Sequence, residues 1–372
     1  SKVERKADKT LWTGNVEGDP IRVVQVEDEV AEARWVAEDI IEKTRNPKPE
    51  TRTSEVITIA EYDDVIAQEE SKRFHTGLLP DFMTIKRFEG DRAELKKFVV
   101  LYRTNAQSRA MEEACLRTGL PYQLVGAIRF YERREVKDML AYLRFIVNPM
   151  DGISFERAIL SSPRGVGLST VEQLLTKAQE QKISALDVAE TEGSKLPPAR
   201  QQSLTSFVNL IRRLDKSLAT LTVSEVIDQA AAGGGLVEYL TDGTSAGEMR
   251  LQNIAELKTV AQERSPGKGK EALEKFLTDV SLWQDQDSFD ASRGAVTLMT
   301  VHAAKGLEFD TVYVIGMEEG LFPHMSSMDD PKELEEERRL AYVAMTRART
   351  NLACLYTQNR RLFGKVTPGI PS

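Results

Sequence analysis

Short apolar and β-branched runs alternate with amphipathic segments near both ends of the chain. Runs of this kind predict β-strands, whereas apolar positions that recur every three to four residues predict helices. The predicted strands are 21–26, 98–102, 122–125, 296–301, 311–315 and 351–356, and the helices between them are 32–43, 107–118 and 131–147. Alternation of strands with helices is typical of a mainly parallel sheet. We therefore expect an α/β domain.

The middle of the chain, from about residue 150 to 290, has almost no strand-like run. Amphipathic helices are predicted there at 169–182, 199–218, 249–262 and 271–283, with proline- and glycine-rich breaks between them. The simplest interpretation is an all-α insertion at 149–286 that divides an α/β domain into residues 1–148 and 287–372. Residues 47–96, which open with a Pro-Lys-Pro turn, are predicted to be an inserted surface element or a tolerated loop expansion.

Two smaller segments are predicted to have structural roles. Residues 130–147 carry an apolar stripe, and we expect the charged residues around it to form a solvated face: Arg133, Glu135, Lys137 and Asp138. Cys115 and Cys354 lack any CxxC spacing, so they are predicted to pack as small hydrophobic residues. No metal site is predicted.

Composition narrows the classes of function. Charged residues make up 29% of the chain, and no apolar run approaches the roughly 20 residues that cross a bilayer. The N-terminal segment also lacks the apolar core of a secretory signal. Together these two observations predict a cytoplasmic protein without a membrane segment. The net charge of -8 argues against coating of nucleic acid through overall basicity, so any DNA binding must be local.

Two polar motifs interrupt the apolar pattern near the C-terminus. The predicted strand 296–301 stops at a loop that carries His, Lys, Gly and Glu, and another strand follows at once. Further on, Leu340, Ala344 and Arg347 have the spacing of one helix face, which places a charge beside residues that should pack inward. Arg347 is either a salt-bridged helix end or an arginine finger that reaches a transferring γ-phosphate.

These motifs carry a family resemblance. Thr-x-His-x-Ala-Lys-Gly-Leu-Glu-Phe at 300–309 and Glu-Arg-Arg-Leu-x-Tyr-Val-x-x-Thr-Arg-Ala at 337–348 resemble motifs V and VI of superfamily 1 DNA helicases of the UvrD/PcrA/Rep type. Further segments resemble the family in the same order: 102–109, 130–138, 316–324 and 361–364. The resemblance covers most of the chain. It implies a RecA-like, P-loop NTPase-like motor domain called 2A with an inserted helical domain called 2B.

The resemblance also implies roles for single residues. Arg347 would contact the γ-phosphate, and Glu308, which follows Gly306 in the same loop, would accept a hydrogen bond from the ribose. The single-stranded DNA groove would be formed by Asn105, Thr300, His302, Lys305, His324 and Phe363. Phe363 would stack on a base, although a lone phenylalanine is more often a core residue. His302 could instead couple the ATP and DNA sites.

A glycine-containing segment in the predicted helical domain offers a second DNA contact. Arg164, Gly165 and Gly167 lie between two helix patterns, where glycine lets a backbone approach a phosphate and Ser169 is placed to cap the second helix. The segment resembles a helix-hairpin-helix-type turn that grips duplex DNA. A plain tight turn between helices explains the same residues.

The sequence contains no Gly-x-x-x-x-Gly-Lys-[Ser/Thr] phosphate loop. ATP and Mg²⁺ would therefore need a further motor domain, and we expect the chain to be the C-terminal part of an ATP-dependent 3′–5′ DNA helicase that is inactive alone. The expected partners are that domain, single-stranded DNA, duplex junctions and DNA repair proteins. The alternatives are a stand-alone, non-catalytic DNA-binding module derived from such a helicase, and a helicase–nuclease subunit.

Overall fold

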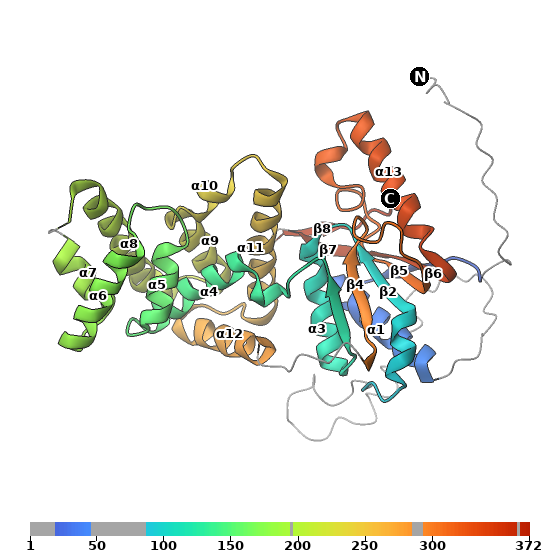
Figure 1. Cartoon of the computed structure of the whole chain (residues 1–372), viewed down its shortest axis with the longest axis horizontal. Helices are drawn as coiled ribbons and strands as arrows, with labels where there is room; N and C mark the ends of the chain where they lie inside the picture. The colour runs from blue at the N-terminus through green and yellow to red at the C-terminus, as the bar shows by residue number, and fades with distance from the viewer. Residues whose placement is uncertain (1–18, 46–86, 194–195, 285–292, 363–364) are drawn as a thin grey trace.

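The computed structural model describes residues 19–45, 87–193, 196–284, 293–362 and 365–372 (Figure 1). Most of the predicted surface element at 47–96, and the predicted base-stacking residue Phe363, lie outside these residues. Among the described residues, no helix is both long and apolar enough to span a membrane.

A parallel sheet forms one half of the molecule. Its strands run in the order β1-β6-β5-β2-β4-β3, and every neighbouring pair is parallel. The strands are β1 (Arg22–Val26), β2 (Phe98–Tyr102), β3 (Tyr122–Val125), β4 (Val296–Thr300), β5 (Phe309–Val314) and β6 (Ala348–Thr357). Segments from before and after the helical region share this sheet, which confirms an α/β fold that is discontinuous in sequence.

Helices cover both faces of the sheet. Successive residues of a strand point to opposite faces, and in β2 the residues on each face are apolar and pack into a separate core cluster. Phe98, Val100 and Tyr102 of β2 pack with α1 (Glu29–Arg45) and α3 (Ser108–Thr118). Val99 and Leu101 join the other core cluster, which includes Ala344 of α13 (Pro331–Met345). Cys115 and Cys354 are free thiols buried in these two clusters, as predicted.

The middle of the chain is helical, as predicted, and lies beside the sheet (Figure 1). A separate apolar core holds these helices together. They are α4 (Arg134–Val147), α5 (Gly152–Leu160), α6 (Leu168–Gln181), α7 (Ala185–Glu192), α8 (Pro198–Ser217), α9 (Val223–Gly233), α10 (Leu236–Leu240), α11 (Ser245–Arg264) and α12 (Gly269–Gln284). The prediction that Ser169 caps a helix is wrong, because α6 begins at Leu168 with Gly167 at the capping position.

The predicted solvated face around α4 is also wrong, because three of its charged residues are buried. Arg133 donates to Asn253 Oδ1 at 2.7 Å and to Ser108 Oγ at 2.8 Å. Glu135 accepts a hydrogen bond from the same Asn253, and Asp138 pairs with an arginine of α5. Helices α5 and α11 cover this side of α4, which periodicity within one helix does not reveal.

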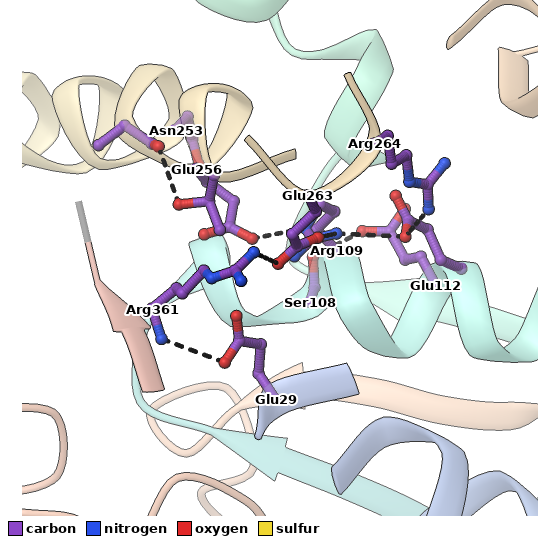
Figure 2. A network of polar contacts seen from close by, with 12 residues as sticks. Glu29, Ser108, Arg109, Glu112, Asn253, Glu256, Glu263, Arg264 and Arg361 are labelled. Atoms are coloured by element: carbon purple, nitrogen blue, oxygen red, sulfur yellow. Dashed lines mark hydrogen bonds and ion pairs between the residues drawn. The ribbon is translucent and has the colours of Figure 1, made fainter. Parts of the chain in front are cut away.

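Figure 2 shows how α11 is fastened to the sheet half by buried ion pairs. Arg109 of α3, only 1% exposed, donates to Glu256 of α11 and pairs with Glu113 and Glu263 at 3.2 and 3.4 Å. Burial raises the pKa of Glu256 and Glu263, although Arg109 opposes that shift. Arg361 of β7 (Asn359–Leu362), which pairs with β8 (Lys365–Pro368), lies 3.7 Å from Glu263.

Candidate nucleotide and DNA site

The motif V loop, residues 301–308, connects opposite edges of the sheet. Thr300 ends β4 beside Tyr102, the last residue of β2, and so lies at the carboxyl edge. Phe309 begins β5 and lies beside Ala348, the first residue of β6, at the amino edge. The residues predicted to contact DNA therefore begin at one edge, and Glu308 and Arg347 lie at the other.

Arg347 lies just beyond the end of α13. The prediction that it shares a helix face with Leu340 and Ala344 is wrong, because α13 ends at Met345 and Thr346 is its C-cap. Arg347 Nη1 donates to the carbonyl of Leu307 at 3.0 Å, while Nε and Nη2 donate to Val343 and Thr346 at 3.0 and 3.1 Å. These acceptors are neutral oxygens, and no carboxylate of the described residues pairs with the guanidinium. The half-buried cation therefore keeps its charge available for an anion.

Glu308 and Gly306 present an open surface beside Arg347. Glu308 Oε2 pairs with Arg349 Nε at 3.3 Å, but both side chains are more than half exposed. Gly306 has a φ of +85° and open space where a Cβ would stand, a backbone conformation that favours glycine. A ligand can therefore approach the backbone of this loop.

A polar cluster of Arg103, His302, His324 and Glu337 lies at the carboxyl edge. Arg103 follows β2 and donates to both carboxylate oxygens of Glu337 at 3.0 Å and, through Nη2, to Oε1 at 2.6 Å. The backbone N–H of His324 donates to Glu337 Oε2 at 3.1 Å. Burial lowers the pKa of His302 and His324, and the charge of Arg103 lowers it further, so both rings are neutral at pH 7.

Of the other predicted groove residues, Asn105 and Thr300 lie at the same carboxyl edge, and Lys305 lies in the motif V loop. Asn105 begins the short 3₁₀ helix η2 (Asn105–Gln107), and its buried Oδ1 has no hydrogen-bond partner among the described residues. Gln252 of α11 lies 3.2 Å from His324 through the side-chain nitrogens. Lys305 is exposed, and the Thr300 hydroxyl accepts from the Ala303 N–H at 3.4 Å.

Sequence reasoning missed Arg103, Gln252 and Glu337. Arg103 and Glu337 lie inside matched family segments, but nothing local shows that they meet across 234 positions of sequence. The arginines beside Phe363 are also used internally: Arg360 is buried between Glu32 and Glu318, and Arg361 pairs with Glu263.

The glycine turn between α5 and α6 has an exposed backbone. Gly165 has a φ of +70°, and neither Gly165 nor Gly167 has an atom within 4 Å of a Cβ position. Arg164 points inward, where it donates to the carbonyls of Ile159 and Gly234 and lies over the Phe207 ring. A DNA contact by Arg164 would require that side chain to turn around.

The six-stranded parallel sheet, which is divided in sequence by a helical region, is that of an α/β protein with a RecA-like fold. A family model described as UvrD-like helicase C-terminal domain matches residues 81–359, and the chain belongs to this family. The chain is 36% identical to the ATP-dependent DNA helicase PcrA of Staphylococcus aureus strain Mu50 over 375 residues, which cover 99% of this chain and 45% of that protein. The PcrA of Staphylococcus epidermidis strain ATCC 12228 matches at 36% identity with the same shares. The chain thus spans about 45% of the length of these relatives.

Proposed function

We propose that the chain is the C-terminal part of an ATP-dependent DNA helicase or translocase that moves 3′ to 5′ in DNA repair or replication. The single observation that carries this proposal is Arg347, a half-buried guanidinium beside Glu308 with neutral oxygens as its partners. The proposed domains keep the sequence-based boundaries: 2A at 1–148 and 287–372, and 2B at 149–286.

In this proposal ATP and Mg²⁺ bind between the amino edge of this sheet and a P-loop domain of the same protein. Glu308 would accept from the ribose hydroxyl, and Gly306 lets the loop approach the nucleotide. Arg347 would contact the γ-phosphate, where a planar, permanently charged group stabilises the negative charge of the transition state. Hydrolysis of ATP supplies the free energy for movement.

Single-stranded DNA would follow the carboxyl edge of the sheet. The proposed contacts are Asn105, Thr300, His302, Lys305, His324 and Phe363. The backbone at Gly165 and Gly167 would contact duplex DNA without reading its sequence. A motor of this kind would act on DNA in the cytoplasm, together with DNA repair proteins.

A stand-alone DNA-binding module is the less favoured alternative, because Arg347 and Glu308 have no purpose without a nucleotide. A measurement of ATP turnover distinguishes the helicase from the stand-alone module. Turnover is measured with and without single-stranded DNA, on this chain and on the natural full-length protein that contains it. We expect DNA-stimulated turnover from the full-length protein and none from the chain alone. Robust turnover by the isolated chain, or a full-length protein without turnover, would overturn the proposal.

A further inference from the structure

Glu337 is the only charged residue of α13 that is buried, at 4% exposure. The rest of the helix is largely exposed, and Ala344 near its C-terminal end is the other buried residue. A buried carboxylate is costly unless it is paired and hydrogen-bonded. Burial raises the pKa of Glu337, but Arg103 and the His324 N–H lower it more, so the net pKa lies below its ordinary value. The group is an anion held by two separate segments.

These two segments belong to the carboxyl edge of the sheet. Arg103 follows β2 directly and precedes Asn105, while His324 caps the short 3₁₀ helix η7 (Met325–Ser327). Both residues lie at the edge of the sheet where the DNA groove is proposed. Glu337 therefore fastens the middle of α13 to the edge of the sheet where a strand of DNA would be held.

The C-terminal end of α13 leads to Arg347. From Glu337 to Met345 the helix runs for about 12 Å at about 1.5 Å per residue. Arg347 Nε donates to the carbonyl of Val343 in the last turn, so the guanidinium is oriented by the helix itself. The C-terminal half of α13 is a rigid connection between the two edges of the sheet, anchored by Glu337 near the middle of the helix and by Ala344 near its C-terminal end.

We propose that Glu337 is a positioning residue that couples DNA in the groove to the placement of Arg347, through its ion pair with Arg103, its hydrogen bond from His324 and the rigid helix α13. This inference rests on the proposed function. A shift of Arg103 or His324 on DNA binding would move Glu337, and α13 would carry that movement to the arginine. Glu337 itself touches neither nucleotide nor DNA.

The test uses the full-length protein and compares ATP turnover with and without single-stranded DNA. We expect Glu337→Ala to reduce the stimulation by DNA about 10- to 100-fold, the range typical of misplaced catalytic groups and of coupling between sites. The KM for ATP and the DNA dissociation constant should change far less. Glu337→Gln keeps a hydrogen-bond acceptor for His324, so it should recover part of the stimulation.

Two further variants separate coupling from a merely structural effect. Glu335→Gln is the matched control, because Glu335 lies on the same helix and pairs with Arg338 and Arg339 of that helix; its stimulation should be normal. Arg103→Ala should lose stimulation to the same extent as Glu337→Ala, and the double variant should be no worse, as expected for partners in one interaction. Full stimulation in Glu337→Ala, or equal loss of turnover with and without DNA, would overturn the inference.

Hydrogen exchange keeps the test independent of the proposed function. If the unmodified protein shows no DNA-stimulated turnover, the proposed function fails, and amide exchange across 338–347 then decides the role of Glu337. Faster exchange there in Glu337→Ala, with normal exchange in Glu335→Gln, supports the anchor. Unchanged exchange in both variants contradicts it.

Discussion

Arg347 Nη1 lies 3.0 Å from the carbonyl oxygen of Leu307, the residue immediately before Glu308. The Phe309 N–H in turn donates to the carbonyl of Arg347 at 2.9 Å. The end of the motif V loop and the residue that follows α13 are therefore held together from both sides. A nucleotide that contacts Glu308 would meet Arg347 at the same place.

Glu308→Ala should impair nucleotide binding without loss of stability. Its ion pair with Arg349 is exposed, and such pairs contribute about 0–1 kcal/mol. Loss of a hydrogen bond to a charged group costs about 1.5–3 kcal/mol, so the KM for ATP of the full-length protein should rise about 10- to 100-fold. Asp310→Ala is the control, because Asp310 lies 3.8 Å from the same arginine. An unchanged KM in Glu308→Ala would exclude the ribose contact.

Arg109→Ala should destabilise the contact between the sheet half and α11. The substitution leaves the largely buried carboxylates of Glu256 and Glu263 (Figure 2), and the buried carboxylate of Glu113, without their shared cation. Removal of one partner from a buried pair costs about 3–5 kcal/mol, and the cost should grow as pH rises and Glu256 and Glu263 ionise. Denaturant unfolding measures this loss, and Arg34→Ala is the control, because Arg34 is 58% exposed and pairs with Glu38 of the same helix. A loss below about 1 kcal/mol would contradict the buried network.

Glu112 should make stability depend on pH. Burial raises its pKa from 4.5 to about 7, while Arg133 and hydrogen bonds from Ser108 and the Phe130 N–H oppose that shift. Between these values the folded state binds more protons than the unfolded state, so the free energy of unfolding falls as pH rises. For this group the fall amounts to about 3 kcal/mol at most.

Glu112→Gln should flatten this dependence, because the amide does not titrate. The measurement is the free energy of unfolding from pH 4.5 to 7 for the unmodified chain and the variant. Glu172→Gln, at an exposed position, should keep the slope of the unmodified chain. Equal slopes in Glu112→Gln and the unmodified chain would show that Glu112 is not the group responsible.

Much of the sheet was predictable because its strands are short and apolar on both faces. Phe98–Tyr102 is buried at every position, and its predicted bounds match β2. The helices α5, α7, α9 and α10 were missed, since each is only 5 to 11 residues long and so shows few repeats of the helical period. Arg347 was placed on a helix because residue spacing alone does not show that α13 ends at Met345.

The candidate site was only partly predictable. Residues within one motif, such as Gly306 and Glu308, were found because their chemistry is local. The pair of Arg103 and Glu337 was not, because the tertiary fold alone brings together residues 234 positions apart. The inward turn of Arg164 likewise depends on Gly234 and Phe207, which are distant in sequence.

The most direct measurement is DNA-stimulated ATP turnover by the full-length protein carrying Arg347→Ala. Loss of an arginine finger typically costs about 10³ to 10⁵ in rate, so turnover should fall by that order while DNA binding is retained. Arg347→Lys should recover little, because a point charge lacks the planar fork of the guanidinium. Arg338→Ala, which removes an exposed arginine of the same helix, should turn over normally. Turnover that is unchanged in Arg347→Ala would contradict the proposal that this arginine completes an ATP site.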